Sequence, residues 1–144
     1  MQKVSHTPVT EFSLDPQNWD EVRKAGHRML DDMFAHLEGI RNQPVWQPLP
    51  AETKDALNAP LPMEGSDTNE VYNDFLEHVL PYNLGNIHPR FWGWVCGTGT
   101  ATGMLADMLA SGMNASPSFG EHASIYVEKQ VINWSKQFRW PGGR

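Results

Sequence analysis

A long helical pattern near the start of the chain constrains its fold more than any other feature. Apolar residues recur at steps of three and four between residues 16 and 42, after an Asp15-Pro16 pair that is typical of a helix start. The stripe consists of Trp19, Val22, Gly26, Met29, Met33, Leu37 and Ile40. At 1.5 Å per residue this helix would be about 40 Å long, longer than a compact domain of 144 residues usually needs. We therefore expect a helical arm whose apolar stripe needs a partner surface.

Prolines interrupt the helical pattern after this first segment. Residues 43–66 contain five prolines, which lack a backbone donor and push the preceding residues out of helical geometry. Only a short helix fits between them, from Ala51 to Leu57. Asp67, with Glu70 three residues later, predicts the start of the next helix, which ends before Gly85.

The stretch 86–99 has a different composition, rich in aromatic residues and glycine. This composition suits an extended segment with turns, and it is the one place where we expect strand-like structure. Two further helices are expected, over 102–111 with a stop at Gly112 and over about 121–138. The sequence thus predicts a mainly α fold with an irregular aromatic and glycine-rich middle stretch.

Composition excludes several classes of partner. The net charge is −6 and the 11 basic residues are scattered, which argues against a nucleic-acid or anionic-membrane surface. No apolar run reaches the length of a signal peptide or a membrane span. The single cysteine, Cys96, excludes an internal disulfide and fits a reducing compartment. We expect a cytoplasmic protein without membrane or nucleic-acid partners.

The chemistry-bearing residues favour structural roles. The six histidines show no zinc-ligand spacing, and His88 before Pro89 is interpreted as a hydrogen-bonded structural residue. The run from Gly97 to Thr100 lacks the lysine of a phosphate-binding loop and is interpreted as a turn. Cys96, beside Val95, is interpreted as a small buried apolar residue rather than a nucleophile. No catalytic or metal-binding residue is predicted.

The order of elements after His88 resembles a known family. An aromatic stretch (Phe91 to Trp94) leads through a glycine and threonine turn into a helix containing the run Met104 to Leu109. This segment resembles the N-terminal part of the pyridoxal-phosphate-dependent group II amino-acid decarboxylases, the family of aromatic-L-amino-acid decarboxylase. The resemblance extends upstream to Asp15-Pro16 and downstream through Glu128 to Trp134, so it covers nearly the whole chain.

The resemblance implies a segment of a fold-type I pyridoxal phosphate (PLP) enzyme that forms a homodimer. Residues 1–85 would be a helical dimerisation segment, and residues 86–144 would be a substrate-pocket stretch with helices that lead into a PLP-binding domain. The positions at which family members line the substrate side-chain pocket are occupied here by Trp94, Val95, Cys96 and Gly97. Animal members typically have tyrosine, phenylalanine, proline and threonine there, so the resemblance does not specify which amino acid is the substrate.

The lysine that would bind PLP is missing from this chain. In the family this lysine follows a histidine, and no His-Lys pair occurs here. The chain also stops at Arg144, about where the cofactor domain would begin, so we expect an N-terminal fragment that is inactive and binds no cofactor alone. Two other functions remain open: a non-catalytic helical self-association module, and a binder of small aromatic ligands that uses Trp92 and Trp94.

Overall fold

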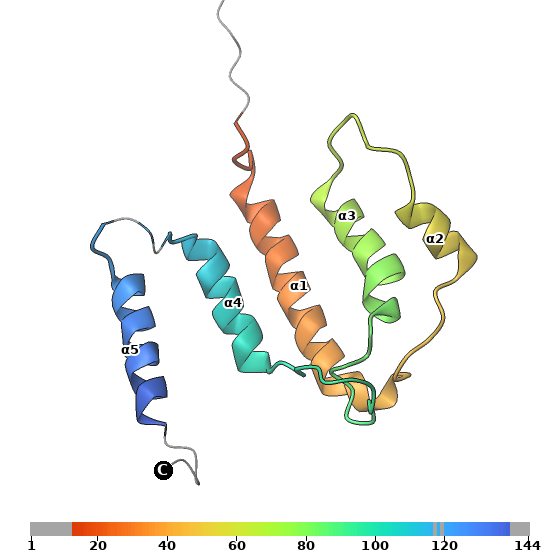
Figure 1. The fold of residues 1–144 in the computed structure, drawn as a ribbon. Helices are drawn as coiled ribbons and strands as arrows, with labels where there is room; N and C mark the ends of the chain where they lie inside the picture. Colours follow the sequence, from red (N-terminus) through yellow and green to blue (C-terminus); the bar gives the residue numbers. More distant parts are fainter. Residues whose placement is uncertain (1–12, 117, 119, 139–144) are drawn as a thin grey trace, which may run out of the picture. The chain divides into compact units, whose positions relative to one another are not determined.

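A computed structural model describes residues 13–116, 118 and 120–138 of the chain. These residues form helices joined by turns and irregular segments, with no β-strand among them (Figure 1). The predicted mainly α fold is therefore confirmed. The chain divides into two compact units, Met1–Thr98 and Gly99–Arg144. No helix in the described part of the chain is long and apolar enough to cross a membrane.

The first unit contains three α-helices and three short helical turns. They are α1 (Trp19–Gly39), η1 (Ile40–Asn42), α2 (Ala51–Leu57), α3 (Thr68–Asp74), η2 (Phe75–Val79) and η3 (Leu80–Tyr82). The predicted bounds of α2 are confirmed, and so is Asp67 as the N-cap of α3, since its side chain accepts a hydrogen bond from the Asn69 backbone N–H at 2.8 Å.

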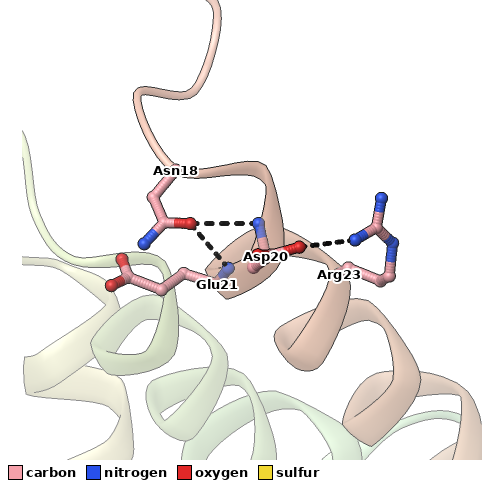
Figure 2. Close-up of polar contacts among 4 residues, drawn as sticks. All are labelled: Asn18, Asp20, Glu21 and Arg23. Carbon is pink, nitrogen blue, oxygen red and sulfur yellow. Dashed lines mark hydrogen bonds and ion pairs between the residues drawn. The ribbon is translucent and has the colours of Figure 1, made fainter.

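Asn18, rather than Asp15, begins α1. Its side-chain oxygen accepts hydrogen bonds from the backbone N–H groups of Asp20 at 3.1 Å and Glu21 at 3.4 Å (Figure 2). These two donors have no partner within the helix, so the cap stabilises the first turn. The predicted start at Asp15-Pro16 was wrong, because the backbone N–H of Asp15 is held by the Ser13 hydroxyl in a local turn before the helix. An ion pair between Arg23 and Asp20 at 2.6 Å adds an exposed contact on the first turn (Figure 2).

The seam between α1 and α3 holds the best-buried apolar side chains of the described residues, Ala25 and Tyr72. The Tyr72 hydroxyl donates a hydrogen bond to Asp32 Oδ2 at 2.8 Å. The Arg28 guanidinium lies 5.0 Å from the centre of the Tyr72 ring and also donates to Asn73 Oδ1 at 2.9 Å. α1 and α3 lie side by side (Figure 1), and polar contacts of Arg28 and Asp32 join them beside the buried Ala25 and Tyr72.

The apolar stripe of α1 remains partly uncovered. Of the stripe residues, Trp19 is 62% exposed and Val22 41%, whereas Met29 and Met33 are half-buried. Phe34, which widens the stripe, is 37% exposed. The helical periodicity predicted from the sequence is confirmed, and part of the stripe is available to another surface.

The second unit contains α4 (Ala101–Met113) and α5 (Ala123–Gln137). The Thr100 hydroxyl caps α4 by accepting a hydrogen bond from the Gly103 backbone N–H at 2.9 Å. The predicted stop at Gly112 was wrong, because Gly112 continues the helix and Asn114 ends it in the left-handed conformation, with φ 43° and ψ 40°. Asparagine is one of the few residues other than glycine that adopt this conformation readily.

The second unit has no core of its own among its described residues, none of which is buried. A groove of about 530 Å³ between α4 and α5 is lined mainly by apolar side chains, among them Leu109, Met113 and Val127. Helices with this much exposed apolar surface are stabilised by a further surface rather than by each other.

Candidate functional site

The four predicted substrate-binding residues lie in one loop of the first unit. Trp94, Val95, Cys96 and Gly97 fall between η3 and α4, in a region of turns and bends. The strand-like structure expected for 86–99 is absent there. Residues 86–97 are called the aromatic loop below.

The start of the aromatic loop is organised by His88. This residue is only 2% exposed, and its backbone N–H donates to Gly85 O at 2.9 Å. Its Nδ1 accepts from the Arg90 backbone N–H at 3.0 Å, and its carbonyl accepts from the Phe91 N–H at 2.9 Å. The prediction that His88 is a hydrogen-bonded structural residue is confirmed.

A small cavity lies behind His88. It has a volume of about 200 Å³ and is lined by residues from α1, η3 and the segments around them, including His36, Val45 and Asn83. The Nε2 atoms of His36 and His88 are buried and have no hydrogen-bond partner among the described residues. Since Nδ1 of His88 accepts a hydrogen bond, the neutral ring carries its proton on Nε2, which is a donor and not a metal ligand. Nor does the described part of the chain hold any group of three metal-ligating side chains.

Gly85, just before the aromatic loop, packs against the backbone of Val45. It has a φ of 81°, and a Cβ placed on it would lie 1.8 Å from the carbonyl oxygen of Val45. The Asn83 side chain accepts a hydrogen bond from the Gly85 N–H at 2.7 Å and fixes this turn. Only glycine combines a left-handed backbone with so close an approach.

The two ends of the aromatic loop are joined by a side chain. Nδ2 of Asn86 donates a hydrogen bond to the carbonyl oxygen of Gly97 at 2.6 Å. Inside the loop, the rings of Phe91 and Trp94 lie 6.3 Å apart and are tilted by 54°. A Cβ on Gly93 would lie 3.1 Å from the Phe91 ring, so the small residue lets the ring pack closely.

Trp94 has a left-handed backbone, with φ at 44°. For a residue with a large side chain this conformation costs on the order of 1–3 kcal/mol, and it persists only where the surroundings hold it. Trp94 is nevertheless 79% exposed and Val95 is fully exposed. Cys96 is also exposed, so the prediction that it is a buried apolar residue was wrong. The loop projects these side chains away from the unit that supports them.

The loop offers a surface for binding. Exposed indole and apolar side chains on a closed loop can form one wall for a flat or apolar group. Sequence reasoning found this aromatic segment and missed the roles of Gly85 and Asn86, which hold it. A glycine next to asparagine and before a His-Pro pair was the available signal for a turn.

The chain was compared with known protein families, sequences and structures. No protein-family model matches the chain. The aromatic-L-amino-acid decarboxylase of Bacillus atrophaeus is 28% identical over 120 residues, which are 81% of this chain and 25% of that protein. Tyrosine decarboxylase 1 of Narcissus pseudonarcissus is 25% identical over 142 residues, 92% of this chain and 28% of that protein. The chain is homologous to part of the aromatic amino-acid decarboxylases.

The fold also occurs in solved structures. A crystal structure of Oryza sativa TDC with PLP and tryptamine superposes with a TM-score of 0.58 and 24% sequence identity, over 71% of this chain and 21% of that one. The chain therefore has the fold of a segment of that enzyme. The family resemblance predicted from the sequence is confirmed by the homology to the curated decarboxylases. It spans about a quarter of the length of the curated relatives it matches.

Proposed function

We propose that this chain is the segment of a PLP-dependent amino-acid decarboxylase that supplies dimer contacts and one wall of the substrate side-chain pocket. Residues 1–85 would provide the dimer contacts, and residues 86–144 would provide the pocket stretch and the helices that lead into the PLP-binding domain. The observation that carries the proposal is the homology, over most of the chain, to enzymes named for aromatic amino acids. The exposed aromatic loop adds a surface suited to such side chains.

In this proposal, Trp94, Val95, Cys96 and Gly97 face the substrate side chain, and Trp94 forms the main wall. An indole ring offers a large flat area with few rotatable bonds, so it can orient a planar group at a small entropic cost. Val95 extends the apolar surface, and Gly97 leaves room beside it. The loop would orient the substrate side chain and exclude water from it. The reacting groups would lie in other parts of the complete enzyme.

The described residues of this chain do not fit a PLP site. All four lysines among them are exposed: Lys24, Lys54, Lys129 and Lys136. None has the buried environment that turns a lysine into a nucleophile. PLP, when bound in the complete enzyme, supplies the electron sink for loss of carbon dioxide, and we assign its binding to the rest of that enzyme.

The test is Trp94→Ala in the complete enzyme. The ratio of kcat/KM values among tryptophan, tyrosine and phenylalanine should change by more than about tenfold, roughly 1.4 kcal/mol of differential transition-state binding. Trp46→Ala is the matched control, since Trp46 is 63% exposed and lies outside the loop. If all substrates slow equally, Trp94 only supports the fold and the proposal fails.

The isolated chain provides a second measurement. Saturable quenching of tryptophan fluorescence by free aromatic amino acids, at micromolar concentration and without PLP, would favour a small-ligand binder instead. Under the proposed function the loop is one wall of a pocket, so the isolated chain should show no saturable quenching in that range.

A further inference from the structure

A hydrogen bond from a side chain joins the two ends of the aromatic loop, which contains the proposed pocket wall. The amide of Asn86 donates to the Gly97 carbonyl at 2.6 Å, across eleven residues of sequence. Asn86 is half-buried, and Gly97 is the last of the four proposed pocket residues. The bond therefore encloses every residue proposed to face the substrate.

This bond acts on a strained segment. Trp94 lies within the closed loop with its backbone in the left-handed region, which tryptophan rarely adopts. On the N-terminal side, the turn at His88 and the Phe91 ring against Gly93 fix the chain. On the C-terminal side, the bond from Asn86 holds Gly97, three residues after Trp94. The loop is thus held at both ends, as a strained conformation requires.

We propose that Asn86 is a positioning residue that sets substrate selectivity by keeping the aromatic loop closed around Trp94. The inference rests on the proposed function of the loop. Without the donor, the loop opens at Gly97, Trp94 relaxes to an ordinary backbone conformation, and its indole turns away from the substrate side chain. Asn86 itself need not touch the substrate.

The side chain at position 86 must donate to a carbonyl, which gives two informative substitutions. Asn86→Asp keeps the shape and replaces the donor by a carboxylate oxygen, which repels the Gly97 carbonyl. Asn86→Ala removes the donor without adding charge. Asn133→Asp is the matched control, because it makes the same charge change at an exposed position on α5.

The experiment is a double-mutant cycle in the complete decarboxylase. Asn86→Asp and Asn86→Ala should each shift the kcat/KM ratio among tryptophan, tyrosine and phenylalanine by about tenfold or more, in the direction of Trp94→Ala. In the Trp94→Ala background the same substitutions should shift the ratio by less than about twofold, because a residue that acts through Trp94 has nothing left to position. Asn133→Asp should leave the ratio unchanged.

The outcomes separate the inference from the proposed function. If Trp94→Ala shifts the ratio and the Asn86 variants do not, the inference is refuted and the proposed function stands. Additive shifts in the double variants also refute it, since Asn86 would then act independently of Trp94. If Trp94→Ala leaves the ratio unchanged, the proposed function fails and the inference fails with it.

A measurement on the 144-residue chain tests the structural step even if a variant enzyme does not fold. The three-bond coupling between the amide and α protons of Trp94 reports its φ angle. Asn86→Ala should change this coupling while the helical circular dichroism stays the same. An unchanged coupling would mean that Trp94 keeps its conformation without Asn86, and it would overturn the proposal.

Discussion

Replacement of Gly85 by alanine should destabilise the first unit more than any other single methyl addition at a glycine in that unit. The added Cβ would lie 1.8 Å from the carbonyl oxygen of Val45, whereas real Cβ contacts are essentially never shorter than 3.0 Å. The backbone of one partner must therefore move by about 1.2 Å. The Val45 oxygen is a backbone atom and the added Cβ is bonded directly to the backbone of residue 85, so no flexible side chain can absorb the movement.

The magnitude follows from three contributions. An alanine at φ 81° costs about 1–2 kcal/mol relative to glycine. The forced movement disrupts two hydrogen bonds of the turn, from Gly85 N–H to Asn83 and from His88 N–H to Gly85 O, each contributing about 0.5–1.5 kcal/mol. The reduced entropy of the unfolded chain offsets about 0.4–1 kcal/mol. The net loss is about 1–4.5 kcal/mol of unfolding free energy.

Urea unfolding followed by circular dichroism and tryptophan fluorescence measures this loss. Gly26→Ala is the matched control, because Gly26 lies in α1 with nothing within 4 Å of an added Cβ. The control should stabilise the chain by about 0.5–1 kcal/mol, as alanine does for glycine within a helix. A Gly85→Ala variant within about 0.5 kcal/mol of the wild type would refute the reasoning, since so small a change is typical of an uncrowded surface site.

Three further predictions concern titration, assembly and the cofactor. Burial, followed by the hydrogen bond to Asp32, raises the pKa of Tyr72 above 10.0, so its contribution to stability is complete below about pH 10 and is lost as pH rises through the folded pKa. Tyr72→Phe should remove this loss of stability at alkaline pH. If the urea midpoint of the variant falls as much as that of the wild type between about pH 8 and about pH 11, ionisation of Tyr72 is not the cause. The uncovered part of the α1 stripe predicts a two-fold dimer at micromolar concentration in analytical ultracentrifugation. The double variant Val22→Glu with Phe34→Glu should dissociate this dimer. A stable monomer of the wild-type chain over the micromolar range would exclude the dimer. Borohydride treatment of the isolated chain with PLP should leave no stoichiometric adduct on one lysine, as measured by mass spectrometry, and such an adduct would place a cofactor site in this chain.

The sequence was informative about elements that local signals delimit. The bounds of α2 were predictable because prolines on both sides leave room for only one short helix. The start of α1 was not, because Asp15 and Asn18 are both good caps and only the folded geometry shows which oxygen reaches the free donors. Asn114 was overlooked as the end of α4 because Gly112, two residues earlier, carries the stronger statistical signal.

The exposed residues of the candidate site were proposed from the sequence, and the contacts that support them were not. The aromatic composition and the family resemblance identified the residues around Trp94. The contacts that hold them depend on segments that are distant in sequence, such as the approach of Gly85 to Val45 and the cavity shared by His36 and His88. Helical periodicity and capping rules carry no information about such contacts, because these rules describe neighbours along one segment.

The conformation of Trp94 itself argues that its side chain acts outside the described fold. A left-handed position is occupied most favourably by glycine or asparagine, so stability alone would select one of these residues. The indole gains little in return, since it is 79% exposed and its aromatic contact is a tilted pairing with Phe91 at 6.3 Å. Trp94→Gly should therefore stabilise the isolated chain, or leave its unfolding free energy unchanged, while removing the wall that we propose for the substrate. A residue that costs stability in its own unit and projects from a loop held at both ends is placed as binding residues commonly are, on a rigid support with the side chain free to meet another surface.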